Sequence, residues 1–153
     1  RTEIPAFAKS LYELAKTTGF VSSDFPIDTA LQLYPLDLFS AYAITTAIQR
    51  YGQNERSLFT FLASQENISR EASANNQTYN LQKVYDYIYY SFYSYLKDAN
   101  ADSMNWSSMQ VSIERGEGQS WDSQEQMLHA INIIKAIGLL NLFGVAGFRL
   151  PKE

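Results

Sequence analysis

The segment QNERSLFTFL, residues 53–62, places an amide, a carboxylate and a guanidinium directly before an apolar run. Asn54 is a good helix N-cap, and Glu55 in the first turn suits the positive end of the helix dipole. Arg56 is slightly disfavoured there, so it needs an anionic partner. A guanidinium is always charged and can bind two oxygens of a carboxylate or a phosphate. Two interpretations stay open. Arg56 pairs with a local carboxylate and fixes the loop after Gly52, which the sequence favours, or it binds a phosphate or a neighbouring domain.

Other residue types that carry chemistry are sparse. His129 is the only histidine and there is no cysteine, which excludes a disulfide, a thiol nucleophile and a cysteine-ligated metal. A zinc site or a serine triad would have to be built on this one histidine. The sequence contains neither G-x-x-x-x-G-K-[ST] nor G-x-G-x-x-G. The carboxylate pairs Glu114 with Glu117 and Asp122 with Glu125 are typical of solvated helix ends. We therefore predict no catalytic residue, metal site or cofactor in this segment, and a structural or surface role for His129.

Composition and charge narrow the class of protein. With 46% hydrophobic and 18% charged residues, the 153-residue chain is typical of one soluble globular domain. Its net charge of −4 argues against a general nucleic-acid surface. The apolar run 131–145 is broken by Asn132, Lys135 and Asn141, so we expect no membrane span. The absence of cysteine fits a reducing compartment, and we predict a cytoplasmic protein.

Apolar residues recur at helical spacing along most of the chain, and no stretch alternates with a period of two. We therefore predict an all-α fold, a bundle of about six to seven helices over residues 1–153, with a sub-boundary considered in the polar loop 73–80. The main apolar stripes are formed by Ile4, Phe7, Ala8, Leu11, Leu14 and Ala15; by Leu36, Phe39, Ala43, Ile44, Ala47 and Ile48; by Leu81, Val84, Tyr85, Ile88, Phe92, Tyr95 and Leu96; by Trp106, Met109 and Ile113; and by Met127, Leu128, Ile131, Ile134, Ile137 and Leu140 or Leu142. The last set is expected to be buried. Shorter helices are expected from Asp28, after Asn54 and from Glu66 to Ala72, and glycine stops at Gly19, Gly52, Gly116 to Gly118 and Gly144.

Helix starts are marked by specific residues. Pro35 suits the first turn of the helix that contains Leu36, and Asp37 favours its positive end. Asp122 or Ser123 is expected to cap the last long helix.

The helix from Leu81 carries more tyrosines than its apolar stripe uses. Tyr87, Tyr90 and Tyr93 fall outside that stripe. Tyrosine is favoured at protein interfaces, so these three are candidates for binding a partner. The alternative is that they serve amphipathic packing, covered by neighbouring domains.

Three stretches together resemble a known family. YPLDLFSAYAITTAIQRYGQNERSLFTFLAS (34–64) and NIIKAIGLLNLFGVAGFRL (132–150), with VYDYI (84–88) between them, are similar to segments of large prokaryotic P-loop ATPases. These are the AAA+/STAND-like ATPases of phage-defence and related conflict systems. Asp37 and Leu38 replace a histidine and a second proline of the family pattern. From the first to the last, the three blocks span roughly Tyr34 to Gly144, which is most of the chain.

The resemblance implies a helical lid or linker region downstream of the nucleotide-binding core, with ATP and Mg²⁺ held by the missing part of the parent protein. Both ends of the chain look cut, which fits this expectation. Arg56 would then be a nucleotide sensor supported by Asn54 and Glu55. The expected partners are the ATPase core and effector domains, and the function is to couple nucleotide state to an effector. The alternative is a stand-alone helical module that binds protein through its tyrosine-rich face.

Overall fold

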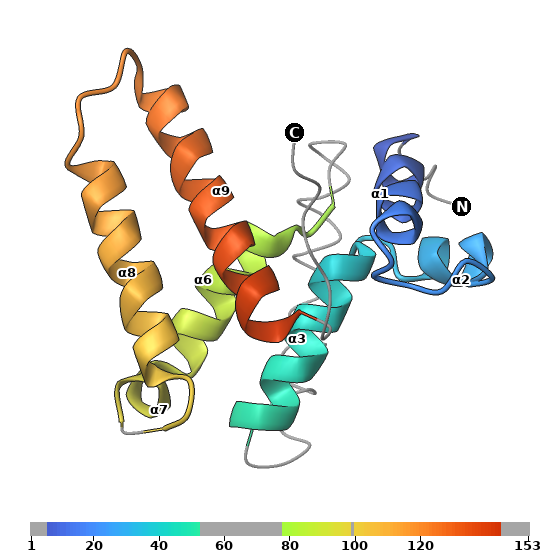
Figure 1. The fold of residues 1–153 in the computed structure, drawn as a ribbon, viewed down its shortest axis with the longest axis horizontal. Helices are drawn as coiled ribbons and strands as arrows, with labels where there is room; N and C mark the ends of the chain where they lie inside the picture. Colours follow the sequence, from blue (N-terminus) through green and yellow to red (C-terminus); the bar gives the residue numbers. More distant parts are fainter. Residues whose placement is uncertain (1–5, 53–77, 99, 145–153) are drawn as a thin grey trace. The chain divides into compact units, whose positions relative to one another are not determined.

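The computed structural model describes residues 6–52, 78–98 and 100–144, and these form seven α-helices and no β-strand (Figure 1). The all-α prediction is confirmed for this part of the chain. The helices are α1 (Ala6–Thr17), α2 (Ile27–Gln32), α3 (Leu38–Tyr51), α6 (Leu81–Ser91), α7 (Tyr93–Lys97), α8 (Ser103–Glu117) and α9 (Gln124–Phe143).

The chain divides into two compact units, and the division falls after Asn80, at the end of the polar loop 73–80. The first unit contains α1, α2 and α3. The second unit, Leu81–Phe143, contains α6 to α9. Each unit is described by itself.

In the first unit, α1 stops where the sequence predicts. Gly19 adopts a φ of 72°, a left-handed conformation that glycine reaches without strain. The chain then turns back, because the Phe20 amide donates to the carbonyl of Ala15. The Phe20 ring packs against Phe39 of α3, with 4.6 Å between ring centroids. α2 begins at Ile27, close to the predicted start at Asp28.

The start of α3 is built on a buried carboxylate. Asp37 is its N-cap: Oδ1 accepts a hydrogen bond from the Ser40 amide at 2.8 Å, and Oδ2 accepts one from the Thr78 hydroxyl at 3.2 Å. Pro35 lies before the helix and not in its first turn as predicted, because the cap falls two residues later. The Pro35 carbonyl accepts a hydrogen bond from the Tyr79 amide at 2.7 Å. Desolvation raises the pKa of Asp37, although the hydrogen bonds that it accepts oppose this shift.

In the second unit, the predicted helix from Leu81 is interrupted. Phe92, with φ −117° and ψ 18°, separates α6 from α7. Val84 and Ile88 on α6 are buried as expected, and so is Leu96 on α7. Tyr95 is exposed, contrary to the prediction, because the break ends the regular helical spacing on which the predicted stripe depends.

The helices α8 and α9 form an antiparallel hairpin joined by residues 118–123 (Figure 1). Ser123 caps α9, since its hydroxyl accepts from the Gln126 amide at 3.1 Å. The Trp121 indole donates to the Gly116 carbonyl at 2.6 Å and ties the connection to the end of α8. The predicted core positions of α8 (Trp106, Met109 and Ile113) are all buried.

The predicted core of α9 is confirmed at one position only. Ile131 is buried as predicted, whereas Leu128 and Ile137 are 48% and 40% exposed. The other predicted positions, Met127, Ile134, Leu140 and Leu142, are only partly buried. Leu139 and Phe143 are buried although they were not predicted to be. The physical reason is that α9 is apolar on most of its circumference, so the pattern of apolar residues does not single out the face that packs.

Among the described helices, α9 is long and apolar enough to cross a membrane by length and composition, which the sequence analysis did not expect. Core helices of soluble proteins pass the same test, but they are mostly buried, whereas only 17% of this window of α9 is buried. Length and composition of one helix do not by themselves assign it to a membrane.

Candidate protein-interaction surface

The residues proposed from the sequence fall into two groups. Arg56, Asn54 and Glu55 lie outside the described residues. Tyr87, Tyr90 and Tyr93 lie on α6 and at the start of α7, where their surroundings are defined.

Four tyrosines of this region form one group of touching rings, which we call the tyrosine cluster: Tyr85, Tyr89, Tyr90 and Tyr93. Tyr85 and Tyr89 stack with 5.9 Å between centroids. Tyr89 meets Tyr90 at 5.8 Å and Tyr93 at 5.3 Å, in both cases edge to face. Such offset and perpendicular arrangements are the favourable ones for aromatic pairs. The rings therefore hold each other in defined orientations.

The inner end of the cluster is anchored in the second unit. Tyr85 is buried, its ring lies 5.5 Å from that of Trp106, and its hydroxyl donates to Gln110 Oε1 at 2.9 Å. Burial raises the pKa of Tyr85 far above its ordinary value, so its hydroxyl stays neutral and remains a donor. Lys135 of α9 lies 5.4 Å from the same ring and forms an ion pair with Asp86 at 2.8 Å.

The outer end of the cluster faces solvent. Tyr90 is 78% exposed and Tyr93 is also exposed. The ammonium group of Lys97 lies 4.4 Å from the Tyr93 ring centroid, a cation–π contact. A hydrogen bond with Tyr93 raises the pKa of Lys97, so the lysine is fully charged at neutral pH. Burial raises the pKa of Tyr89. The outer end thus presents neutral aromatic rings beside one fixed cation.

Tyr87 stands apart from this row. It is half-buried, its hydroxyl is hydrogen-bonded to Ser91, and burial raises its pKa. At 100° per residue it lies 200° around α6 from Tyr85. The structure therefore links Tyr90 and Tyr93 through the ring of Tyr89, a residue that was not among the predicted candidates. The four-residue spacing of Tyr85, Tyr89 and Tyr93 in the sequence could have indicated this row of rings.

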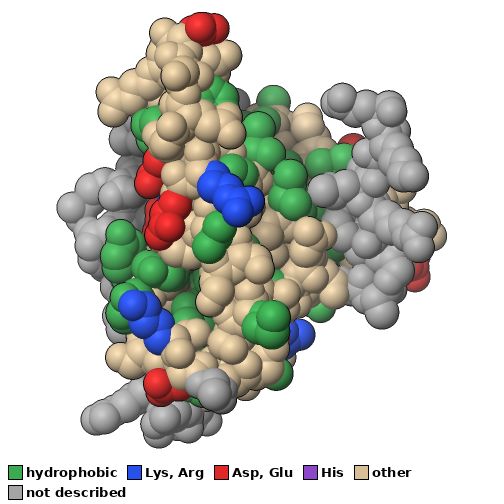
Figure 2. Space-filling view, turned by 60° about the vertical axis from the view of Figure 1, so that its left-hand side comes forward, with side chains coloured by type: hydrophobic (Ala, Val, Ile, Leu, Met, Phe, Trp, Pro, Cys, Tyr) green, Lys and Arg blue, Asp and Glu red, His purple; other side chains and the backbone are tan. Residues whose placement is uncertain are grey.

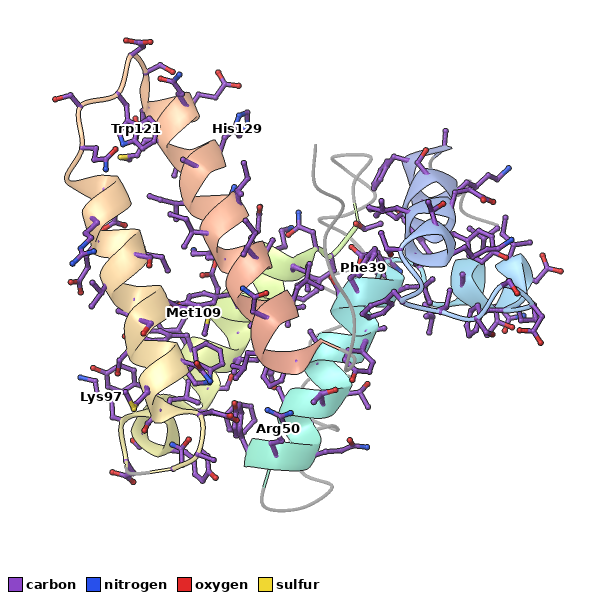
Figure 3. The ribbon with its side chains drawn as sticks, viewed as in Figure 1. Phe39, Arg50, Lys97, Met109, Trp121 and His129 are labelled. Atoms are coloured by element: carbon purple, nitrogen blue, oxygen red, sulfur yellow. The ribbon has the colours of Figure 1, made fainter. Side chains whose placement is uncertain are left out.

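The other sequence candidates show no catalytic arrangement. His129 is exposed on α9 (Figure 3). Within the described residues, no three His, Asp or Glu side chains come close enough together to hold a metal ion. Glu114, Glu117, Asp122 and Glu125 are all exposed at helix ends, as predicted.

Comparison with known proteins gives no relative: no protein-family model, curated protein or solved structure matches the chain.

Proposed function

We propose that the chain is a non-catalytic helical domain that binds another protein through the outer end of the tyrosine cluster. The observation that carries this proposal is the exposure of Tyr90 and Tyr93 while both rings rest edge to face on Tyr89. Tyrosine and tryptophan are enriched at protein interfaces and among the residues that contribute most to binding.

The geometry lowers the cost of binding. A tyrosine has only two side-chain torsions, so it offers a large contact area for little loss of conformational entropy. Here the ring contacts orient Tyr90 and Tyr93 before any partner arrives. Preorganisation of this kind improves affinity because less freedom is lost on association.

The chemistry of the surface suits a partner of mixed character. Each ring offers an apolar face, and each neutral hydroxyl can donate or accept a hydrogen bond. Lys97 adds one charged donor beside Tyr93. A cytoplasmic protein or a neighbouring domain of the same polypeptide, with apolar side chains and a carboxylate at matching positions, fits this surface.

A photo-crosslinking experiment tests the proposal. Benzoylphenylalanine replaces Tyr90 in the full-length protein in its host cells, and adducts are mapped by mass spectrometry after irradiation. This residue keeps an aromatic ring at position 90. We expect one dominant adduct, either to another protein or to a distant segment of the same polypeptide, and its loss when Tyr93→Ala is added.

The matched control places the crosslinker at Leu14, an exposed apolar residue of α1 in the first unit. The proposal fails if positions 90 and 14 give the same unspecific adducts, or if Tyr93→Ala leaves the adduct at position 90 unchanged.

The wider setting of this domain is a second part of the proposal. On the resemblance of residues 34–64 and 132–150, the parent protein is a P-loop ATPase, and this domain couples its nucleotide state to an effector. Arg56 is then the residue that senses the nucleotide phosphates. An arginine that stabilises transferring phosphate is worth roughly 10³-fold or more in turnover in other nucleotide hydrolases.

The test of this part measures ATP turnover by the full-length protein with Arg56→Ala and with Arg56→Lys, once circular dichroism shows that the helices are intact. A sensor requires the bidentate guanidinium, so both variants lose turnover. Unchanged turnover in both variants makes Arg56 part of a helix start and an ion pair.

A further inference from the structure

A groove of about 370 Å³ lies between α8 and α9. Its lining comes from both helices: Asn105, Ser108, Met109 and Ser112 on α8, and Ile134, Ile137, Gly138, Asn141 and Leu142 on α9.

Met109 of α8 and Gly138 of α9 both line the groove and contact each other across it. Met109 lies between α8 and α9 (Figure 3) and packs directly on Gly138, where an added Cβ would come within 2.7 Å of Met109 Cγ. Glycine at this position lets the two backbones approach. The contact keeps the hairpin closed under the groove and makes the floor apolar.

The two walls differ in chemistry. The α9 wall is mainly apolar, with Ile134, Ile137 and Leu142. The α8 wall is polar but uncharged and contains Ser108 and Ser112, whose small side chains allow another backbone to come close. No charged side chain lines this groove among the residues that the structure describes.

A second hollow, of about 510 Å³, continues from the α8 wall, because both hollows share Ser108 and Ser112. Its outer edge carries Lys97 and Arg115. Arg115 forms no ion pair with any described residue, and Lys97 contacts the Tyr93 ring and not a carboxylate. The space-filling view brings the α8 side forward and shows separate Lys or Arg side chains on a face that also carries hydrophobic atoms, neutral polar atoms and some Asp or Glu side chains (Figure 2).

A neighbouring side of α9 packs against a helix of this unit, because Lys135 of α9 reaches Asp86 of α6. At 100° per residue, the groove-lining residues Leu142, Gly138 and Ile137 lie about 20°, 60° and 160° around α9 from Lys135, in the same sense. The groove therefore lies beside the face of α9 that carries the contact with α6. A groove between two antiparallel helices is the shape that accepts a third helix.

We propose that the surface formed by these two hollows binds an amphipathic helix of another protein that is apolar along one edge and acidic along its flank. The apolar edge packs on Ile134, Ile137 and Leu142. The acidic flank faces Lys97 and Arg115. The stripe from Ser103 to Arg115 is about 18 Å long, which matches a partner helix of three to four turns. This surface shares Lys97 with the outer end of the tyrosine cluster, but it contains neither Tyr90 nor Tyr93, so it goes beyond the proposed function.

Two synthetic peptides test the proposal with the whole 153-residue chain. Both are helices of about 14 residues with the same leucine edge, and the flank carries glutamate in one and lysine in the other. Binding is measured by fluorescence anisotropy. We expect the glutamate peptide to bind about tenfold more tightly than the lysine peptide, with an affinity that falls as salt is added.

Variants locate the binding. Arg115→Glu reverses one charge at the edge and should lower the affinity for the glutamate peptide by about threefold to tenfold. Ile137→Ser removes part of the apolar wall and should lower the affinity for both peptides by about tenfold. Lys9→Glu makes the same charge reversal at an exposed site on α1 and should leave both affinities unchanged. Tyr90→Ala should also leave them unchanged, which separates this surface from the tyrosine cluster.

Any of these results would overturn the proposal: equal affinity for both peptides, no binding of either peptide, no loss of affinity with Arg115→Glu, or an equal loss with Lys9→Glu. Concentration-dependent dimerisation that Ile137→Ser abolishes would also overturn it, because the occupant would then be a second copy of this chain.

Discussion

The helices α3 and α9 are both rich in apolar residues, yet they use them differently. Seven of the fourteen residues of α3 are buried, whereas only three of the twenty residues of α9 are. Ile44 of α3 is 3% exposed, and Ile133 of α9 is 58% exposed. Composition alone therefore does not tell which apolar residues stabilise the fold and which remain available to a partner.

The difference begins at the helix start. Asp37, with hydrogen bonds to Ser40 and Thr78, fixes where α3 begins and which face turns inward. α9 has a good cap at Ser123, but its apolar residues surround the helix. Its packing depends instead on three buried residues, Ile131, Leu139 and Phe143, and on the contact of Gly138 with Met109. The exposed isoleucines of α9 are thus unused by the second unit.

The largest expected effect comes from one substitution made in both helices. Ile44→Ala leaves a cavity and should lower the free energy of unfolding by about 2–5 kcal/mol. Ile133→Ala removes solvent-exposed surface and should change it by less than about 0.5 kcal/mol. Urea unfolding followed by circular dichroism measures both. Equal losses would show that α9 buries Ile133 as α3 buries Ile44.

The next effect concerns the approach of α8 and α9. Gly138→Leu places a side chain where Met109 lies and should cost about 1–3 kcal/mol of stability by overpacking. Adding Met109→Ala should restore part of this loss, because it removes the clashing atoms. The control is Gly118→Ala, at the open end of α8, which should stay within about 0.5 kcal/mol of wild type. If the double variant is no more stable than Gly138→Leu, the contact is not the cause.

Asp37→Ala removes the N-cap of α3 and should lower the free energy of unfolding by about 1 kcal/mol. The pH dependence carries more information. Because burial raises the folded pKa of Asp37 above the ordinary value of 3.8, folding favours the protonated carboxyl. The contribution that this pKa difference makes to the free energy of unfolding is fully present below pH 3.8, and it is lost as the pH rises through the pKa of Asp37 in the folded protein.

Asp37→Asn keeps an acceptor for the Ser40 amide and removes this titration. Stability measured from acid to neutral pH should therefore fall less steeply, or rise more steeply, in Asp37→Asn than in wild type. Parallel pH profiles for the two proteins would mean that the carboxyl of Asp37 titrates alike in the folded and unfolded states.

The smallest effect is at the ion pair between α6 and α9. Asp86 is about half exposed, so Lys135→Met or Asp86→Asn should each cost less than about 1 kcal/mol. A double-mutant cycle measures the coupling between them. A coupling well above this range would show that the ion pair, more than apolar packing, holds α9 against α6.

Where local chemistry is decisive, the sequence predicted the fold well. Helices begin or end close to the expected places at four residues, Gly19, Asp37, Gly52 and Ser123. Each of these residues provides a helix cap or a turn. The break at Phe92 had no such signal, since neither glycine nor proline marks it.

The candidate site was only partly predictable. Tyr90 and Tyr93 were selected because they leave the apolar stripe, but the link through Tyr89 depends on ring contacts that tertiary structure creates. The exposed face of α9 could not be predicted, because a helix that is apolar all around shows no preferred side. The role of Arg56 rests on resemblance and stays a prediction.

The central claim, that a partner covers the exposed tyrosines, is tested most directly by hydroxyl-radical footprinting. The oxidation rates of Tyr90 and Tyr93 are compared between the purified 153-residue chain and the protein inside its host cells, with the exposed Tyr42 of α3 as internal reference. Relative to Tyr42, we expect Tyr90 and Tyr93 to be oxidised readily in the purified chain and to be strongly protected in cells. Equal relative rates in both settings would contradict the account.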